Sequence, residues 1–296
     1  MSIHSSLELF HLMSFPKMTR KKVQNYLLID PQLTRIRQLE GNELSRYFSL
    51  PLPIAKSLQQ YLSHTPVRKH HENRFFSLNP LTIYDEDYPT SLASIPDPPL
   101  ILYTRGNREL LKHHLLSVIG SRKPSPNAKK KIDFLLPPLI HHDISIVSGL
   151  AYGIDSMSHR ITLEEKGKTI AVLAFGFNHI YPASHVGLYQ AIEKEGLLVT
   201  EYPPETKPQR WQFPERNRII SGLSQATLII EAAIKSGTMI TADQALEQGK
   251  EVFVVPDSIF LPEAAGCLKL LQEGATPVAK PEDLLNSWSS IGLKSI

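Results

Sequence analysis

The sequence of 296 residues has a single cysteine, Cys267, and none of its apolar runs approaches the length of a membrane span. One cysteine excludes an internal disulfide and a cysteine cage for zinc, and it indicates a reducing compartment. A helix needs roughly 20 consecutive apolar residues to cross a bilayer, so we expect no membrane contact. The N-terminus also lacks the basic-then-apolar pattern of a secretory signal. These absences predict a cytoplasmic protein.

Motifs that would define a cofactor or a reaction are missing as well. There is no G-x-G-x-x-G dinucleotide fingerprint followed by an acidic residue, no P-loop and no H-E-x-x-H zinc motif. Ser148, Asp155 and His159 suggest a hydrolase, but Asp155 and His159 lie one helical turn apart, which does not match a triad. Glu231 is the best candidate acid, and its alternative role is hydrogen bonding to the loop at 236–238. We therefore predict no catalytic residue, no cofactor and no metal site.

The formal net charge of +3 divides unevenly along the chain. Residues 1–74 contain 11 Lys and Arg against 5 Asp and Glu, whereas residues 75–296 contain 21 against 24. A further concentration lies between Arg105 and Lys131, where 8 basic residues accompany one acid, Glu109. A basic segment suits a polyanion partner, but a solvated lysine-rich surface gives the same count. Charge alone leaves both interpretations open.

Periodicity and turn residues divide the chain into four parts. Residues 1–65 show short helical patterns separated by proline and glycine, which predict a small all-helical domain. Residues 66–77 lack an apolar period, which is typical of a linker. Residues 78–281 alternate apolar strands with helical stretches, which predicts an α/β fold with an extended Rossmann-like parallel sheet and helices on both faces. Residues 282–296 are predicted to form a short C-terminal tail.

Glycine-rich loops follow four of the predicted strands. Ligands of open α/β sheets bind beyond the carboxyl ends of the strands, where helix N-termini favour anions. One such glycine is explained by turn geometry alone, but four at one sheet edge resemble a row of phosphate cradles. The loops contain Gly120-Ser121-Arg122, Ser148-Gly149, Phe175-Gly176-Phe177 and Ser236-Gly237-Thr238.

Two arginines, Arg216 and Arg218, flank Asn217 at a predicted helix start. Arginine opposes the helix dipole at an N-terminus, so the pair indicates a bound anion, with a surface ion pair to Glu215 as the alternative. Aromatic residues lie in or beside the strand-end loops, and core packing accounts for some of them. Single-stranded nucleic acid requires cations for its phosphates and aromatic rings for its unpaired bases. The aromatic residues are Tyr152, Phe175, Phe177, Tyr181, Tyr202, Trp211 and Phe213.

Several of these segments form an ordered set of motifs. They include V-I-G-S-R at 118–122, S-G-L-A-Y-G-I-D at 148–155, F-P-E-R-N-R at 213–218 and S-G-T-M-I-T-A at 236–242. In this order they closely resemble the DprA/Smf family of DNA-processing proteins, over about residues 80–280. The resemblance implies a non-catalytic protein that binds and protects incoming single-stranded DNA in natural transformation, forms a homodimer and loads the RecA recombinase.

The resemblance also implies a basic pocket for the phosphate backbone, formed by the Gly-Ser-Arg loop, the Arg-Asn-Arg segment and Lys168, and a dimer contact on the helix at 264–273. Together with the strand-end loops, the predicted DNA-binding residues are Gly120, Ser121, Arg122, Lys168, Phe177, Arg216, Asn217, Arg218, Ser236, Gly237 and Thr238. The predicted dimer residues are Cys267, Leu268 and Leu271.

Three features depart from the family pattern. Val255-Pro256-Asp257 stands where many relatives have Val-Pro-Gly. The N-terminal domain resembles the family's sterile-alpha-motif or helix-hairpin-helix domain, but residues 15–18 read F-P-K-M instead of a glycine hairpin, so a hairpin contact with DNA is not predicted. The stretch after Lys280 is also too short for the winged-helix domain of many members, which we expect to be absent.

An enzyme of the LOG-type phosphoribohydrolase class, which cleaves the base from a nucleoside monophosphate, is the alternative function. Its G-G-x-G-T-x-x-E motif resembles the loop at 236–238, but Thr241 occupies the position of its glutamate. A scaffold that binds another protein through the helical domain is a third alternative.

Overall fold

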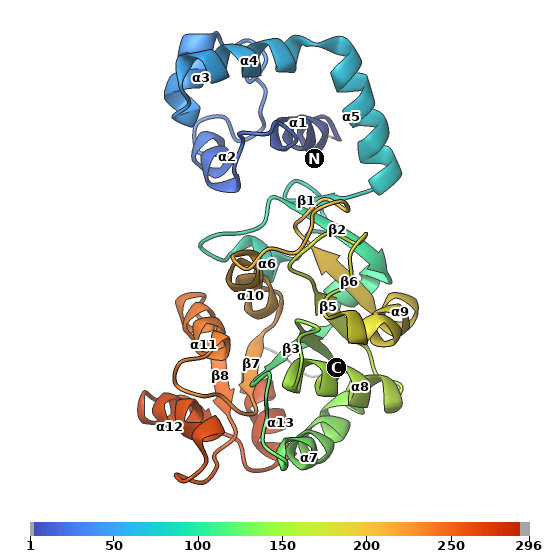
Figure 1. The fold of residues 1–296 in the computed structure, drawn as a ribbon, viewed down its shortest axis with the longest axis vertical. Helices are drawn as coiled ribbons and strands as arrows, with labels where there is room; N and C mark the ends of the chain where they lie inside the picture. Colours follow the sequence, from blue (N-terminus) through green and yellow to red (C-terminus); the bar gives the residue numbers. More distant parts are fainter. Residues whose placement is uncertain (1–2, 291–296) are drawn as a thin grey trace. The chain divides into compact units, whose positions relative to one another are not determined.

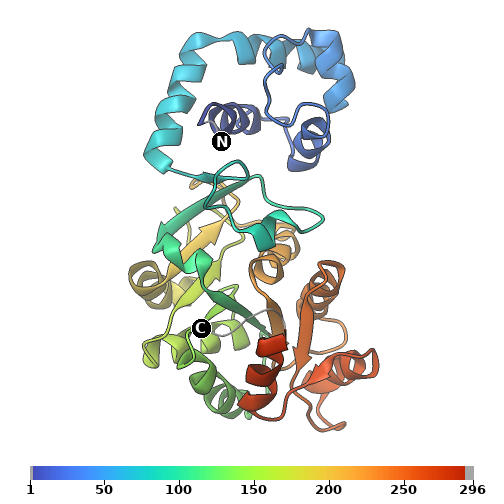
Figure 2. The same cartoon turned by 180° about the vertical axis from the view of Figure 1, so that it is seen from behind.

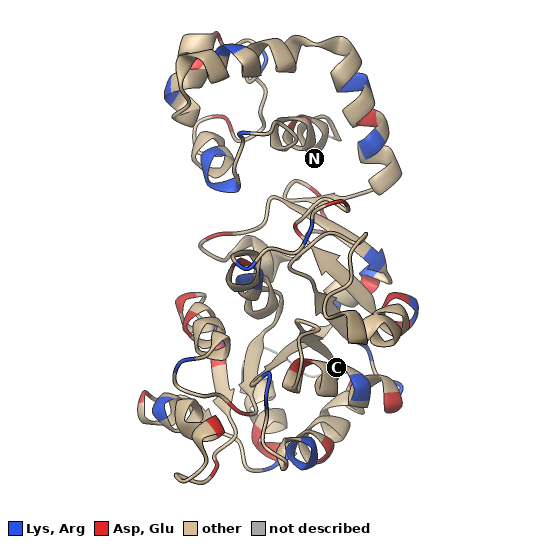
Figure 3. Ribbon diagram, viewed as in Figure 1, with Lys and Arg blue, Asp and Glu red and all other residues tan. Residues whose placement is uncertain are grey.

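The computed structural model describes residues 3–290, which divide into two compact units (Figure 1). Among the described residues, the first unit comprises residues 3–88 and 99–103, and the second comprises residues 89–98 and 104–290. Figure 3 shows Lys and Arg on helices and loops of both units, so basic residues are not confined to the first unit. No helix in the described part of the chain has the length and apolar character that a membrane span requires.

The first unit is mainly helical, and it extends beyond the predicted domain boundary at residue 65. Its helices are α1 (Ile3–Met13), α2 (Arg20–Leu27), α3 (Gly41–Phe48), α4 (Leu52–Ser63) and α5 (Thr65–Leu78). Leu9 of α1, Leu44 of α3 and Leu58 of α4 are fully buried in its core. The unit also contains β1 (Leu81–Thr82), which pairs antiparallel with the first residues of β2 (Ile101–Gly106).

Residues 66–77, predicted to be a linker, form most of helix α5 instead. Pro66 lies in the first turn, where its missing N–H costs no hydrogen bond, and His64 Nδ1 accepts a hydrogen bond from the N–H of Val67. Phe75 is the buried residue of this helix, and its ring packs edge-on against Phe10 with 5.4 Å between centroids. The sequence pattern did not reveal the helix because one buried position gives no apolar period.

The second unit contains a parallel sheet in the order β6-β5-β4-β3-β7-β8-β9. Its strands are β3 (His114–Ile119), β4 (Ile144–Ser148), β5 (Thr169–Val172), β6 (Leu197–Thr200), β7 (Ala226–Ile229), β8 (Glu251–Val254) and β9 (Thr276–Pro277). Every residue of β4, β5, β6 and β7 is buried, which explains their near-continuous apolar sequences. The predicted Rossmann-like sheet is therefore confirmed.

The helices of this unit are α6 (Thr90–Ala93), α7 (Ala128–Ile140), α8 (Ile154–Glu164), α9 (Val186–Glu195), α10 (Gln212–Leu223), α11 (Gly237–Glu247), α12 (Ala265–Gln272) and α13 (Pro281–Ser290), with short 3-10 turns at Arg108–Lys112, Ala183–His185 and Pro262–Ala264. Alternating side chains of β3 show that helices cover both faces of the sheet. Leu116 and Val118 join an apolar core with Ile132 of α7. Ser117 points the other way, and its Oγ donates a 2.7 Å hydrogen bond to the carbonyl of Ile220 in α10.

The predicted C-terminal tail is in part a packed helix. Within residues 282–296, the chain up to Ser290 belongs to α13, which packs against α7 (Figure 2). Leu284 and Trp288 are buried in the same apolar core as Ile132. Their burial makes α13 a part of the second unit, while residues 291–296 lie outside the described part of the chain.

Candidate nucleic-acid interface

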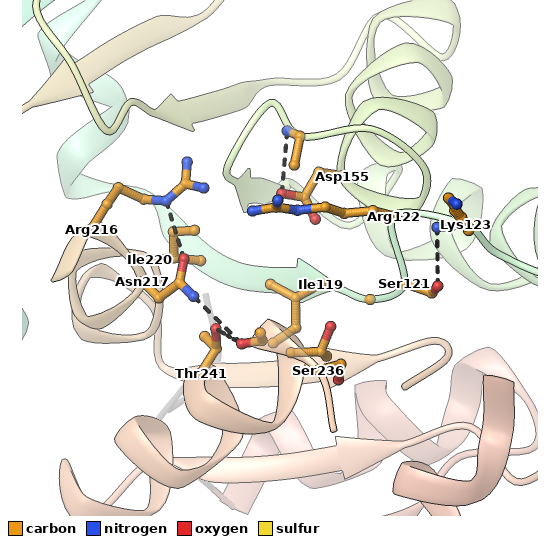
Figure 4. Close-up of a pocket in the computed structure, with 14 residues that line it drawn as sticks. Ile119, Ser121, Arg122, Lys123, Asp155, Arg216, Asn217, Ile220, Ser236 and Thr241 are labelled. Atoms are coloured by element: carbon orange, nitrogen blue, oxygen red, sulfur yellow. Dashed lines mark hydrogen bonds between the residues drawn. The ribbon is translucent and has the colours of Figure 1, made fainter. Parts of the chain in front are cut away.

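A cavity lies at the edge of the sheet where the strand order reverses. β4 lies on one side of β3 and β7 on the other, so the loops that leave β3 and β7 diverge and open a crevice. The cavity has a volume of about 420 Å³. Its walls are the loops after β3, β4 and β7 together with α10 (Figure 4). The lining residues are Ile119, Gly120, Ser121, Arg122, Lys123, Ala151, Asp155, Arg216, Asn217, Ile220, Ser236, Gly237, Thr238 and Thr241.

The loop after β3 supplies two exposed cations, Arg122 and Lys123. Its start is fixed because the N–H of Ser121 donates a 2.8 Å hydrogen bond to the carbonyl of Glu231. The Ser121 hydroxyl accepts a 3.1 Å hydrogen bond from the N–H of Lys123, which tightens the turn. The Arg122 guanidinium lies 5.6 Å from the ring centroid of Phe213, which holds the charge near the cavity without neutralising it.

Arg216 is a nearly buried cation in the cavity wall, only 3% exposed. Its guanidinium donates hydrogen bonds to main-chain carbonyls, those of Gly149 at 2.6 Å and of Val172. Burial lowers the pKa of Arg216 to about 10, an effect that the charge of Asp155 opposes. The group therefore remains charged at neutral pH, and it is solvated by dipoles of the protein in place of water.

Asp155 is the carboxylate of the cavity, and it acts on the backbone. It accepts hydrogen bonds from the N–H groups of Gly149 at 3.1 Å and Ala151 at 3.4 Å. Burial raises the pKa of Asp155, and the charge of Arg216 opposes this rise. Asp155 thus holds the loop after β4 in shape from the first turn of α8.

The third wall is the N-terminus of α11, where unpaired N–H groups and the helix dipole favour an anion. Asn217 Nδ2 donates a 3.5 Å hydrogen bond to the carbonyl of Gly237, which joins α10 to this wall (Figure 4). A Cβ atom on Gly237 would meet no protein atom within 4 Å, so packing does not require glycine there. The Ser236 hydroxyl has no hydrogen-bond partner within residues 3–290. The uncovered backbone at Gly237 leaves this wall open to a ligand.

All but three of the predicted DNA-binding residues therefore line one cavity. Arg218 is an exception because its guanidinium is bound to acids, to Glu201 Oε2 at 2.7 Å and Asp97 Oδ2 at 3.2 Å. The prediction misplaced the start of α10, which begins at Gln212, so the Arg-Asn-Arg segment lies inside the helix. Because they are two positions apart on the helix, Arg216 and Arg218 point in different directions, and only Arg216 reaches the cavity.

Lys168 lies outside the cavity as well. It immediately precedes β5, so it lies at the amino end of that strand, opposite the edge where the cavity opens. Lys168 instead lines a smaller cavity with Lys166, His113 and Glu165. The prediction placed it by motif and not by the direction of the strand.

Phe177 is the third exception, because its side chain is buried and is not part of the cavity wall. The Arg105 guanidinium lies 4.8 Å from its ring centroid. The exposed aromatic rings of the strand-end loops are those of Tyr152, Tyr181 and Trp211. Tyr181 packs edge-on against Phe213 with 5.6 Å between ring centroids, which connects it to Arg122.

The residues predicted for dimerisation divide into two kinds. Cys267 is fully buried and accounts for no surface contact, so its assignment is wrong. Leu268 and Leu271 are partly exposed on α12. Cys267 is buried because it lies on the face of the amphipathic helix that packs beside Ala232, whose carbonyl accepts a 2.7 Å hydrogen bond from the N–H of Gly266.

Six of the 14 lining residues were not among the predicted site residues, and three of these six have polar or charged side chains. Lys123 follows Arg122 directly, and its positive charge beside Arg122 was enough to predict a place in the phosphate site. Thr241 lies one turn after Gly237 in α11, and its hydroxyl donates a 3.2 Å hydrogen bond to the Gly237 carbonyl. The role of Asp155 could not be predicted from the sequence, because its contact with the loop after β4 depends on the fold. Glu231, whose alternative role was hydrogen bonding to the loop at 236–238, accepts hydrogen bonds from Ser125 and Lys131 instead.

Comparison with known proteins identifies a family. Residues 79–289 match the family model described as DNA recombination-mediator protein A. The DNA processing protein DprA of Bacillus subtilis is 46% identical over 208 residues, which cover 70% of this chain and 70% of that one. The X-ray structure of DNA processing protein A from Streptococcus pneumoniae matches with a TM-score of 0.85 and 31% identity, over 97% of this chain and 98% of that chain.

A second solved structure concerns the single-stranded DNA binding mode of DNA processing protein A from Helicobacter pylori. It matches with a TM-score of 0.65 and 29% identity, over 72% of this chain and 97% of that chain. The sheet, the cavity at its switch point and these matches agree with the motifs in the sequence. The chain belongs to the DprA/Smf family of DNA recombination-mediator proteins.

Proposed function

We propose that this protein binds single-stranded DNA in the cavity beside β3, protects incoming DNA in natural transformation and loads the RecA recombinase in the cytoplasm. The observation that carries the proposal is the convergence of Arg122, Lys123 and Arg216 on one cavity at the N-terminus of α11. The relative from Helicobacter pylori, whose single-stranded DNA binding mode has been described, supports the choice of ligand.

The cavity suits the phosphodiester backbone in its charge and in its shape. Arg122 and Lys123 are exposed at the rim, whereas Arg216 lies in the wall. A phosphate that enters meets the rim cations first and then the N–H groups of α11, which need no reorganisation. Gly237 leaves the backbone of α11 uncovered, so a phosphate oxygen can approach it closely.

Aromatic rings beside the cavity would receive the bases. Trp211 is 59% exposed and Tyr181 is 46% exposed, whereas duplex DNA offers no unstacked base to either ring. Phe213 links Tyr181 to Arg122 through ring contacts, so a base stacked on Tyr181 would place its phosphate near the rim cations. This arrangement supports single-stranded over double-stranded DNA as the ligand.

We also propose that the cavity is a binding site and not a catalytic one. Its carboxylate, Asp155, is bound to backbone N–H groups, and Ser148 donates its hydroxyl hydrogen to the carbonyl of Val118. Thr241 stands in the wall where a LOG-type enzyme would have its glutamate. Incubation with a panel of nucleoside monophosphates should release no free base, and measurable turnover would establish the enzyme alternative.

Homodimer formation and transfer of the strand to RecA belong to the same proposal. Leu268 and Leu271 are partly exposed on α12. The loop before this helix presents Ile259, 76% exposed, and Phe260, 88% exposed. Large exposed apolar side chains of this kind favour contact with another protein surface.

The test of DNA binding is the salt dependence of affinity for a fluorescent oligothymidylate, measured by anisotropy beside a duplex of equal length. Three phosphate contacts give an expected slope of log affinity against log salt of about −2.1, from about −0.7 per contact in single strands. Tighter binding of the single strand is also expected. A slope near zero, or equal affinity for the duplex, would refute the proposed function.

A further inference from the structure

Glu231 connects the two ends of the loop that carries Arg122 and Lys123. At the start of the loop, the Glu231 carbonyl accepts the 2.8 Å hydrogen bond from the N–H of Ser121. At its end, the Glu231 carboxylate accepts hydrogen bonds from the N–H of Ser125 at 2.7 Å and from the Ser125 hydroxyl at 2.6 Å. One residue therefore fixes both ends of the cationic loop.

The Glu231 carboxylate is fully buried, and its hydrogen bonds are satisfied within the protein. Lys131 Nζ donates a 2.7 Å hydrogen bond to the same carboxylate and also pairs with Asp257. Buried carboxylates are costly unless they are paired and hydrogen-bonded, and this one is both. Lys131 of α7 thus bridges the Glu231 carboxylate to Asp257 in the loop after β8.

The position of Glu231 in the chain adds a second connection. It follows β7 and precedes Ser236 and Gly237, which form the opposite wall of the cavity. The hydrogen bonds from Ser121 and Ser125 therefore tie the loop after β3 to the segment that leads into α11. The spacing of the two walls depends on these bonds.

We propose that Glu231 is a positioning residue that holds the loop with Arg122 and Lys123 in its DNA-binding conformation. The inference rests on the proposed function, because it assigns a role in DNA binding to a residue that does not line the cavity. Glu231 contacts no DNA in this scheme and acts only through the loop. Its removal should reduce binding by the rim cations and leave Arg216 in place.

The first test is the variant Glu231→Gln, assayed as the full chain by anisotropy over a salt series. Gln preserves the shape but replaces one acceptor oxygen with an NH2 donor, so it cannot accept the hydrogen bonds of Ser125 and Lys131 on both atoms as Glu231 does, while Lys131 keeps its partner Asp257. If both rim contacts are lost, the slope becomes shallower by about 1.4 and the affinity at 0.1 M salt falls by up to about 25-fold. Unchanged slope and affinity in a folded variant would overturn the inference.

The second test is a double-mutant cycle that joins Glu231→Gln with Arg122→Ala. If Glu231 acts by placing Arg122, then Arg122→Ala should weaken DNA binding much less in the Glu231→Gln background than in the unchanged protein. Additive losses would show that the two residues act independently, which contradicts a positioning role. A general loss of stability does not produce this coupling at temperatures well below the unfolding midpoint.

The control is Glu201→Gln, which removes a second buried carboxylate paired with a cation. Glu201 binds Arg218 at 2.7 Å, and Arg218 keeps Asp97 as its other partner, as Lys131 keeps Asp257. The control should leave the salt slope unchanged.

If Glu231→Gln does not fold, Ser125→Ala provides a second test. This variant removes one of the two loop contacts and should shift the salt slope in the same direction by a smaller amount. An unchanged slope in Ser125→Ala overturns the inference.

The two proposals fail in different ways. If the unchanged protein shows no salt-dependent binding of single-stranded DNA, the proposed function itself is wrong. If the unchanged protein binds as expected and the folded Glu231→Gln variant binds equally well, only the positioning role is wrong.

Discussion

The Arg216 guanidinium lies so close to Gly149 that a Cβ atom on residue 149 would be 2.5 Å from its carbon. Arg216 in turn donates a 2.6 Å hydrogen bond to the Gly149 carbonyl. Residue 149 must therefore be glycine for Arg216 to remain in the cavity wall. This relationship gives the first prediction, because a single methyl group should displace a charge.

Gly149→Ala should weaken binding of single-stranded DNA by about 5-fold at 0.1 M salt, as expected for the loss of one phosphate contact. The added methyl group should also reduce the free energy of unfolding by about 1–3 kcal/mol, since it overpacks a buried site. Anisotropy and urea unfolding measure the two effects. Wild-type affinity in this variant would show that Arg216 does not contact DNA.

Gly237→Ala should separate binding from stability. The new methyl group meets no protein atom, and alanine in the first turn of α11 stabilises the helix by about 0.5–1 kcal/mol relative to glycine. The methyl group projects where a phosphate would approach, so DNA affinity should fall while the melting temperature is kept or rises. Larger losses are expected for Gly237→Gln. Unchanged affinity in both variants would contradict phosphate binding at this wall.

Charge reversal distinguishes lysines at the two ends of the sheet. Lys123→Glu should make the salt slope shallower by at least about 0.7, since one contact is lost and a repulsive charge is added. Lys168→Glu, with the same change of charge at the opposite edge, should leave the slope unchanged. The pair controls for net charge, and equal effects would mean that long-range electrostatics account for binding.

The fold should lose stability below neutral pH because of His159, which is fully buried with its Nδ1 2.6 Å from Thr169 Oγ1. Burial, assisted by the charge of Arg216, lowers its pKa to about 3. The unfolded chain binds a proton near pH 6.5 and the folded chain does not, so stability present above pH 6.5 is lost as the pH falls towards 3. The expected loss at pH 5 is about 2 kcal/mol.

This pH dependence is measured by urea unfolding at pH 7 and pH 5, compared with His159→Asn. The variant should lack the contribution of His159, so its stability should change less between the two pH values. An identical change in both proteins would show that His159 is not responsible.

Exposed side chains near α12 give a prediction about assembly. Phe260→Asp and Leu271→Asp should each convert a dimer to a monomer, because they place a charge in an apolar contact. Light scattering coupled to size exclusion measures the mass. Cys267→Ser serves as a contrast. Because Cys267 is buried, this substitution should lower the free energy of unfolding and leave the mass in solution unchanged. A monomeric unchanged protein would refute the dimer.

The sheet and most of the cavity could be predicted because both depend on patterns local in the sequence. The apolar strands are buried on both faces, so they are nearly continuous, and the glycine loops follow them directly. Residues that follow parallel strands meet at one edge, which is why Ser121 and Ser236 could be placed together although they are far apart in the chain.

The errors came from directions that a sequence does not display. Arg216 and Arg218 are separated by one residue, and helix α10 turns one towards the cavity and the other towards Glu201. Lys168 lies beside β5 as expected, but at the amino end of that strand, whereas the cavity opens at the carboxyl ends of the strands. Phe177 and Cys267 belong to the right elements, but their side chains face the interior. Glu231 gave no signal for Ser125, which is more than 100 residues away.

Arg216 has a consequence for the rate of DNA binding. Its partners in the described chain are carbonyl groups and Asn217, not an ion pair that a phosphate would have to break. The site therefore keeps a positive field from Arg122, Lys123 and Arg216, and an incoming strand displaces no acid that is hydrogen-bonded to Arg216, although the charge of Asp155 acts on that guanidinium from nearby. Association should be fast at low salt and limited by diffusion in that field, so that most differences in affinity among wall variants arise in the dissociation rate.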